Sequence, residues 1–154
     1  MVLSDNWQTL LAEKENGTSV IISRRLDLEA FIASGKLPIR IEIRYPYSSD
    51  GEGMPATFSY ATIEAIENAL RPVMEGDKLA ILAFQYLGGG EKGWVYYARN
   101  LDVFFERLND ALEEMEELPL TFEAERDPDW EEYLNLIPEE PIIKEEEEEE
   151  EEEE

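Results

Sequence analysis

The run Leu79-Ala-Ile-Leu-Ala-Phe-Gln-Tyr86 is apolar at consecutive positions, so its side chains would be apolar on both sides of a β-strand. A strand of this kind is expected near the middle of a sheet, where both faces are covered. A glycine-rich turn at residues 88–93 follows it, and the chain returns as Trp94-Val-Tyr-Tyr-Ala98. Two apolar runs joined by such a turn predict a β-hairpin. The sequence therefore predicts a sheet built outward from residues 79–98.

The strongest helix signal comes directly after this hairpin. Between residues 101 and 115 the apolar side chains recur at helical spacing, which predicts one core-facing stripe, and Asn100 can cap the first turn. The other face of this helix is acidic. Residues 118–124 then alternate apolar and polar side chains and include Pro119, a pattern typical of an edge strand. The stripe consists of Leu101, Phe104, Phe105, Leu108, Ala111, Leu112 and Met115.

The segment before the hairpin supplies another strand and helix. Apolar residues between 37 and 45 alternate with Arg40, Glu42 and Arg44, which predicts a half-buried strand whose charged row faces solvent. A helix over residues 59–75 follows, so residues 37–124 have a ferredoxin-like βαββαβ order. Residues 7–12 and 20–22 flank an Asn-Gly turn and predict a hairpin. We therefore expect an α+β fold with a mostly antiparallel sheet, which this N-terminal β-hairpin extends beside the 79–86 strand.

The net charge of −25 is distributed unevenly along the 154 residues. Residues 1–98 hold 13 acids and 9 bases, residues 99–144 hold 15 acids and 4 bases, and residues 145–154 are ten glutamates. We expect a single α+β domain over residues 1–138 and an acidic linker and polyglutamate tail over residues 139–154, disordered because a like-charged run buries no apolar surface. Such acidity favours a basic protein partner and disfavours direct binding to a nucleic-acid backbone.

The composition also excludes several chemistries. The chain has no cysteine and no histidine, so it lacks thiolates and the commonest general base and transition-metal ligand. The N-terminal residues do not resemble a signal peptide, and no apolar run is long enough for a membrane span. We therefore expect a cytoplasmic protein that is not bound to a membrane, and we predict no catalytic residue, no metal site and no cofactor.

The block Asp127-Pro-Asp-Trp-Glu-Glu-Tyr-Leu134, together with residues 94–101 and the amphipathic helix, resembles the uncharacterised bacterial family called domain of unknown function 695. The resemblance covers most of residues 5–138, and the Asp-Pro-x-Trp-x-x-Tyr pattern is its most specific part. The family implies an α+β fold, with no established activity. Some members are joined to a domain similar to the regulator of ribonuclease E activity B, which implies a binding or regulatory role.

The favoured hypothesis is a non-enzymatic binding or regulatory module that docks on a basic protein, such as a nuclease or another nucleic-acid-binding protein. Exposed aromatic side chains would serve as anchors for the partner, although aromatics at helical spacing more often face a core. One alternative is a domain that binds a small ligand through the 46–55 loop, and another is an enzyme that uses carboxylates or a carboxylate-bound metal. The candidate partner-binding residues are Trp130, Tyr133, Asp129, Glu132, Glu113 and Glu114.

Overall fold

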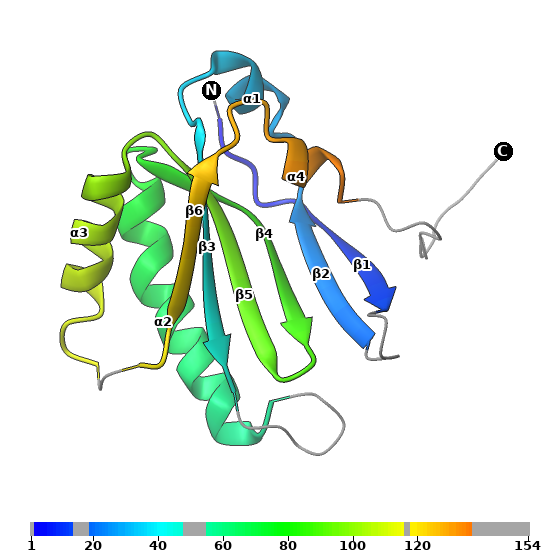
Figure 1. Cartoon of the computed structure of the whole chain (residues 1–154), viewed down its shortest axis with the longest axis vertical. Helices are drawn as coiled ribbons and strands as arrows, with labels where there is room; N and C mark the ends of the chain where they lie inside the picture. The colour runs from blue at the N-terminus through cyan, green and yellow to red at the C-terminus, as the bar shows by residue number, and fades with distance from the viewer. Residues whose placement is uncertain (1, 14–18, 48–54, 116–117, 137–154) are drawn as a thin grey trace, which may run out of the picture.

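The computed structural model describes residues 2–13, 19–47, 55–115 and 118–136, except the side chains of residues 57 and 58. Within these residues the chain is an α+β fold with one six-stranded sheet and four helices (Figure 1). The predicted Asn-Gly turn, the centre of the 46–55 loop, and the linker and polyglutamate tail lie outside the described residues. The elements are β1 (Trp7–Glu13), β2 (Ser19–Arg25), α1 (Glu29–Ser34), β3 (Ile39–Pro46), α2 (Thr57–Glu75), β4 (Ala80–Gly88), β5 (Glu91–Ala98), α3 (Leu101–Ala111), β6 (Thr121–Arg126) and α4 (Glu131–Leu134).

The strands lie in the order β1-β2-β4-β5-β3-β6, and each of these neighbouring pairs is antiparallel. The N-terminal hairpin β1–β2 pairs with β4 through β2, so the predicted extension of the sheet is confirmed. β4 therefore lies inside the sheet, and the residues from Ala80 to Phe84 are all buried. The continuous apolar run in the sequence reflects this position between two neighbouring strands and two covered faces.

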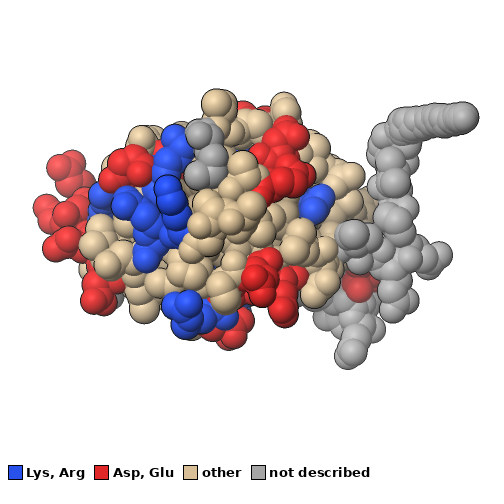
Figure 2. Space-filling view, turned by 90° about the horizontal axis from the view of Figure 1, so that it is seen from above, with Lys and Arg blue, Asp and Glu red and all other residues tan. Residues whose placement is uncertain are grey.

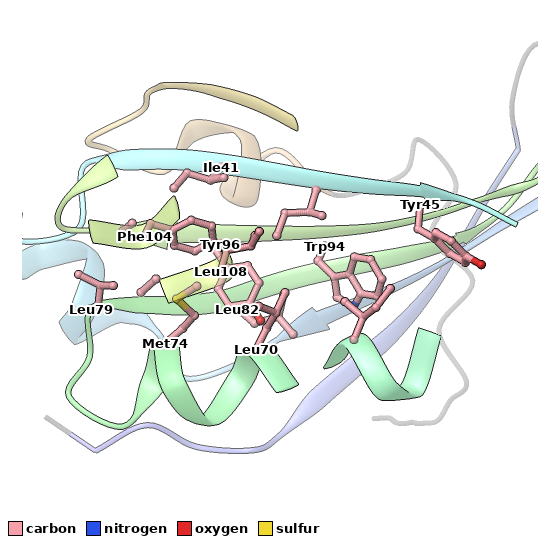
Figure 3. Close-up of a cluster of buried hydrophobic side chains, with 14 of the residues drawn as sticks. Ile41, Tyr45, Leu70, Met74, Leu79, Leu82, Trp94, Tyr96, Phe104 and Leu108 are labelled. Carbon is pink, nitrogen blue, oxygen red and sulfur yellow. The ribbon is translucent and has the colours of Figure 1, made fainter. Parts of the chain in front are cut away.

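The larger core lies between one face of the sheet and the helices α2 and α3 (Figure 3). The alternate residues Ile41 and Ile43 of β3 point into it, and Phe104 and Leu108 of α3 meet them from the predicted helix stripe. The side chain of Asn100 accepts a hydrogen bond from the backbone N–H of Val103 at 2.9 Å, which confirms the predicted cap. The helical spacing of the apolar residues thus determines which face of α3 is buried.

A second, smaller core lies on the opposite face of the sheet, under α1 and α4. Leu28 and Phe31 contribute to it from the α1 region, and Val95 and Tyr97 contribute from β5. In Figure 1, α1 and α4 lie together at the upper end of the sheet. The same face also carries the charged side chains of β3, of which Arg40 pairs with Glu132 of α4.

Candidate protein-binding surface

Strand β6 forms one edge of the sheet and pairs only with β3 among the described strands (Figure 1). All six of its side chains are exposed. The sequence predicted an edge strand over residues 118–124, and the structure confirms the edge position while shifting the strand to residues 121–126. An edge strand presents backbone donors and acceptors along its outer side, which another extended segment can pair with.

A groove lined mainly by apolar residues runs beside this edge, between the end of α3 and the segment that leads into β6. Its volume is about 240 Å³. The ring of Phe122 forms one end and is 42% exposed, and it meets Phe105 of α3 edge-on at 5.2 Å between centroids. The residues that line the groove are Leu108, Asn109, Leu112, Met115, Leu118, Leu120 and Phe122. The edge strand therefore adjoins a surface that can accept apolar side chains.

Acidic side chains border the groove. Glu113 and Glu114, two of the predicted partner-binding residues, are exposed in the turn after α3, between the groove residues Leu112 and Met115. On β6 the side chains of Glu123 and Glu125 are 55% and 66% exposed and lie on the other face of the sheet, where Glu123 pairs with Arg44 at 3.1 Å. Exposed carboxylates beside the groove and along the edge strand attract a positively charged segment and repel an acidic one.

The structure corrects the interpretation of Trp130 and Tyr133 as exposed anchors, because their side chains are only 1% and 4% exposed. The Trp130 indole stacks on Tyr97 with 4.1 Å between ring centroids, and its Nε1 donates a hydrogen bond to the Leu37 carbonyl at 3.0 Å. The Tyr133 hydroxyl donates to the carbonyl of Arg25 on β2. Both rings belong to the smaller core, which is the more common position for aromatics at helical spacing.

Asp127 explains why the Asp-Pro-x-Trp-x-x-Tyr block has the spacing it has. Its carboxylate accepts hydrogen bonds from the backbone N–H groups of Glu131 and Glu132, the first two residues of α4, at 2.9 and 3.1 Å. It also accepts a hydrogen bond from the Tyr97 hydroxyl at 2.7 Å. Burial and this hydrogen bond raise the pKa of Tyr97 well above its usual range. The block therefore holds α4 against β5 and β2, which is a structural role.

The remaining predicted residues, Asp129 and Glu132, lie on the opposite side of the sheet from Glu113 and Glu114. Asp129 is exposed in the turn before α4. The Glu132 carboxylate forms an ion pair with Nε of Arg40 on β3. The six candidate residues therefore do not form one surface, and only Glu113 and Glu114 adjoin the edge strand and its groove.

The charged row of β3 does not face solvent, which corrects the prediction made from its alternating pattern. Arg40 and Glu42 are 3% and 6% exposed. Each charge is compensated by a neighbour: Arg40 pairs with Glu42, and Glu42 also accepts a hydrogen bond from Arg44 at 2.8 Å. Burial disfavours the charged form of Glu42, but hydrogen bonds from Tyr86 and Arg44 outweigh it, and the pKa of Glu42 is below its ordinary value. A buried charge needs partners of this kind.

Tyr86 reaches this row by crossing the neighbouring strand at Gly93. Its hydroxyl donates to Glu42 at 2.6 Å, although Tyr86 belongs to β4 and Glu42 to β3, with β5 between them. A Cβ atom at Gly93 would lie only 2.1 Å from the Tyr86 ring. The sequence analysis assigned Gly93 to a turn and gave no role to Tyr86. The available signal was a glycine inside a strand, which often marks a close approach of another group.

Replacing Gly93 with alanine is expected to lower the free energy of unfolding by about 1–3 kcal/mol, the usual cost of overpacking. The new methyl group would displace the Tyr86 ring and break its hydrogen bond to Glu42. Chemical denaturation of four proteins measures this effect: wild type, Gly93→Ala, Tyr86→Ala and the double variant. In the Tyr86→Ala background, Gly93→Ala should lower the free energy of unfolding much less. An equal decrease in both backgrounds would show that the clash with the Tyr86 ring does not cause the destabilisation.

The described residues contain no group of three or more Asp or Glu side chains placed to hold a metal ion. Among the same residues, no helix is long and apolar enough to cross a membrane.

These features define the class of protein: a strongly acidic α+β protein whose sheet ends in an exposed edge strand beside an apolar groove. The chain belongs to the family described as "Family of unknown function (DUF695)", which matches residues 5–137. The match includes every strand and helix described above, from β1 to α4. The resemblance that rests on residues 94–101 and 127–134 is thereby confirmed. No curated protein and no solved structure matches the chain.

Proposed function

We propose that this protein is a non-enzymatic binding module whose β6 edge docks on a basic protein partner, such as a nuclease or another nucleic-acid-binding protein. The observation that carries the proposal is the fully exposed edge strand beside an apolar groove with an acidic border. Proteins that bind nucleic acid carry clustered Lys and Arg, so they offer the complementary charge. A cytoplasmic location is part of the same proposal.

The alternation of side chains along β6 indicates what kind of segment would fit. Phe122 and Ala124 lie opposite Ile43 and Ile41, so they belong to the face of the sheet that carries α3 and the groove. Glu123 lies opposite Glu42 and belongs to the other face. A partner strand added to this edge would therefore place apolar side chains on the groove side and basic side chains on the other side. The preferred ligand is an extended segment in which apolar and basic residues alternate.

A synthetic peptide of alternating valine and lysine tests this proposal, with a valine–glutamate peptide of equal length as the control for charge. NMR titration of the full chain should shift the backbone amides of residues 121–126 and slow their hydrogen exchange, because the added strand pairs with them. The affinity should fall as salt rises, since exposed charges are screened. Equal binding of both peptides, or shifts confined to other residues, would overturn the proposal.

The double variant Phe122→Ala/Glu125→Gln should weaken the valine–lysine peptide about tenfold, because it removes one apolar and one charged contact. Tyr60→Ala/Glu64→Gln is the matched control. It also removes one exposed aromatic ring and one exposed glutamate, but from α2, and Tyr60 is 48% exposed. This control should leave the affinity unchanged, and a comparable loss would indicate binding through net charge alone.

We also propose a finer description of the fold, with residues 1–138 as one domain and residues 37–124 as a ferredoxin-like unit. The relative order β4-β5-β3-β6 and the position of α2 and α3 on one face support this description. The unit would place β6 at a free edge, where the docking described above requires it.

A further inference from the structure

A pocket of about 300 Å³ lies at the end of the sheet that carries α1, away from the β6 groove. It is formed by three segments that are far apart in the sequence: the end of α1, the turn between α2 and β4, and the residue after β5. The side chains that line it are Phe31, Ser34, Lys36, Leu37, Asp77, Lys78 and Arg99. Its size is at the lower end of the range for small-molecule sites.

The lining carries three positively charged side chains in a protein with a net charge of −25. Within the described parts of the chain, Lys36 and Lys78 have no ion pair, whereas Arg99 forms an ion pair with Asp77 at 3.8 Å. Viewed from above, Lys and Arg side chains gather in one area of this end, with acidic side chains beside it (Figure 2). Because Lys36 and Lys78 have no acidic partner there, an anion beside them would be stabilised.

The acid in the lining does not cancel this charge, because another residue already compensates it. The two oxygens of Asp77 each receive a hydrogen bond from the Arg107 guanidinium, both at 2.8 Å. These hydrogen bonds hold the pKa of Asp77 far below its usual range. Arg107 and Asp77 thus form a bidentate pair, and Asp77 leaves the charges of Lys36 and Lys78 uncompensated.

The backbone of Lys78 has a conformation that is unusual for lysine. Its φ angle is +59°, in the left-handed region that glycine and asparagine enter far more readily than lysine. Its N–H donates to the Glu75 carbonyl at 3.2 Å, and a left-handed residue is common where a helix ends in this way. A lysine at this position keeps a positive charge at the pocket at some cost in stability.

We infer that this pocket binds a small phosphate monoester that carries an apolar group. A phosphate monoester has between one and two negative charges at neutral pH and three acceptor oxygens, which suits two ammonium groups and a guanidinium. The apolar group would lie against Phe31 and Leu37, which form the apolar part of the lining. The Ser34 hydroxyl, which donates to the Phe31 carbonyl at 2.7 Å, adds a further polar group. This site is independent of the β6 surface, so either assignment can fail without the other.

Isothermal titration of the full chain with phenyl phosphate tests the inference, with inorganic phosphate and benzyl alcohol as comparisons. We expect phenyl phosphate to bind saturably and inorganic phosphate to bind more weakly. Benzyl alcohol should not bind. This order follows if the charge supplies most of the affinity and the apolar lining adds to it. Failure of phenyl phosphate to bind, or binding no tighter than that of inorganic phosphate, would overturn the inference.

Two variants locate the site. Lys36→Gln and Lys78→Asn should each weaken phenyl phosphate about tenfold, the size expected for a lost charge-assisted contact. Lys78→Asn should also leave the melting temperature unchanged or raise it, because asparagine accepts a positive φ more easily than lysine. Arg126→Gln is the control, since it removes the same charge from β6, outside the lining. A loss in this control as large as in the lysine variants would refute the site.

Discussion

Trp130→Ala is expected to lower the free energy of unfolding by about 3–5 kcal/mol, the usual range for removing a large buried aromatic side chain. The indole stacks on Tyr97 with the two ring planes 10° apart and meets Tyr133 edge-on at 5.7 Å. Its removal would also deprive the Leu37 carbonyl of the hydrogen bond from Nε1. Urea unfolding, followed by circular dichroism, measures the change.

Leu134→Ala provides the matched control within the same helix. Leu134 is 47% exposed, so its truncation should cost well under about 1 kcal/mol. A Trp130→Ala protein that unfolds at the wild-type urea concentration would contradict the structural role of this ring. If that protein also lost affinity for a basic partner, the interpretation of Trp130 as an anchor would be restored.

The expected cost of Trp130→Ala follows from what the Asp-Pro-x-Trp-x-x-Tyr block does. Asp127 accepts hydrogen bonds from the start of α4 and from the Tyr97 hydroxyl, Trp130 covers Tyr97, and Tyr133 reaches the carbonyl of Arg25. The segment after β6 is thus held across the sheet as far as β2. A family pattern can therefore be specific because several contacts must form together, without marking a binding site.

The sequence predicted those parts of the fold in which a pattern of apolar residues is compatible with only one arrangement of the element. The helical stripe of α3 can bury only one face, and the double-sided apolar run of β4 requires covered faces and neighbours on both sides. The Asn-Gly signal likewise predicted the β1–β2 hairpin, which pairs with β4. The edge position of β6 could also be anticipated, from Pro119 and the alternation around it.

Other features depend on contacts between residues that are distant in the sequence. The alternation around Arg40 and Glu42 is the same whether the charged row is solvated or covered. The charged row is buried because Tyr86 of β4 contacts Glu42 and Glu132 of α4 contacts Arg40. The cations of the small pocket are similarly dispersed, at positions 36, 78 and 99. Composition emphasised the acidic surplus and gave no indication that a few bases would be gathered at one end.

Raising the pH above about 10 is expected to destabilise the protein steeply, because tyrosines that are protonated in the folded state ionise in the unfolded chain. Burial raises the pKa of Tyr96, and burial together with the Asp127 hydrogen bond raises that of Tyr97, both well above the ordinary value. Tyr86 and Tyr133 shift in the same direction, with burial as the largest cause. Below about pH 10 these groups are protonated in both states, and the loss begins as the pH rises beyond it. Each such proton contributes a slope of about 1.4 kcal/mol per pH unit.

The buried Lys92 ammonium acts in the opposite direction, since burial lowers its pKa and the unfolded chain then holds that proton more tightly. Its contribution is limited to one proton and ends near pH 10.4, about the ordinary lysine value. Urea unfolding at successive pH values, with tyrosinate absorbance of the folded protein as a second measurement, gives the net slope. A folded protein in which all seven tyrosines titrate near pH 10 would refute the prediction.

Two substitutions of tyrosine by phenylalanine separate the loss of stability at high pH from the effect of the hydroxyl group on stability at neutral pH. Tyr96→Phe and Tyr97→Phe should each make the alkaline slope shallower by one proton, because each removes one group that ionises on unfolding. At neutral pH they should differ. The Tyr96 hydroxyl has no hydrogen-bond partner among the described residues, so its removal should be neutral or stabilising. The Tyr97 hydroxyl bonds to Asp127, so its removal should cost about 1–3 kcal/mol.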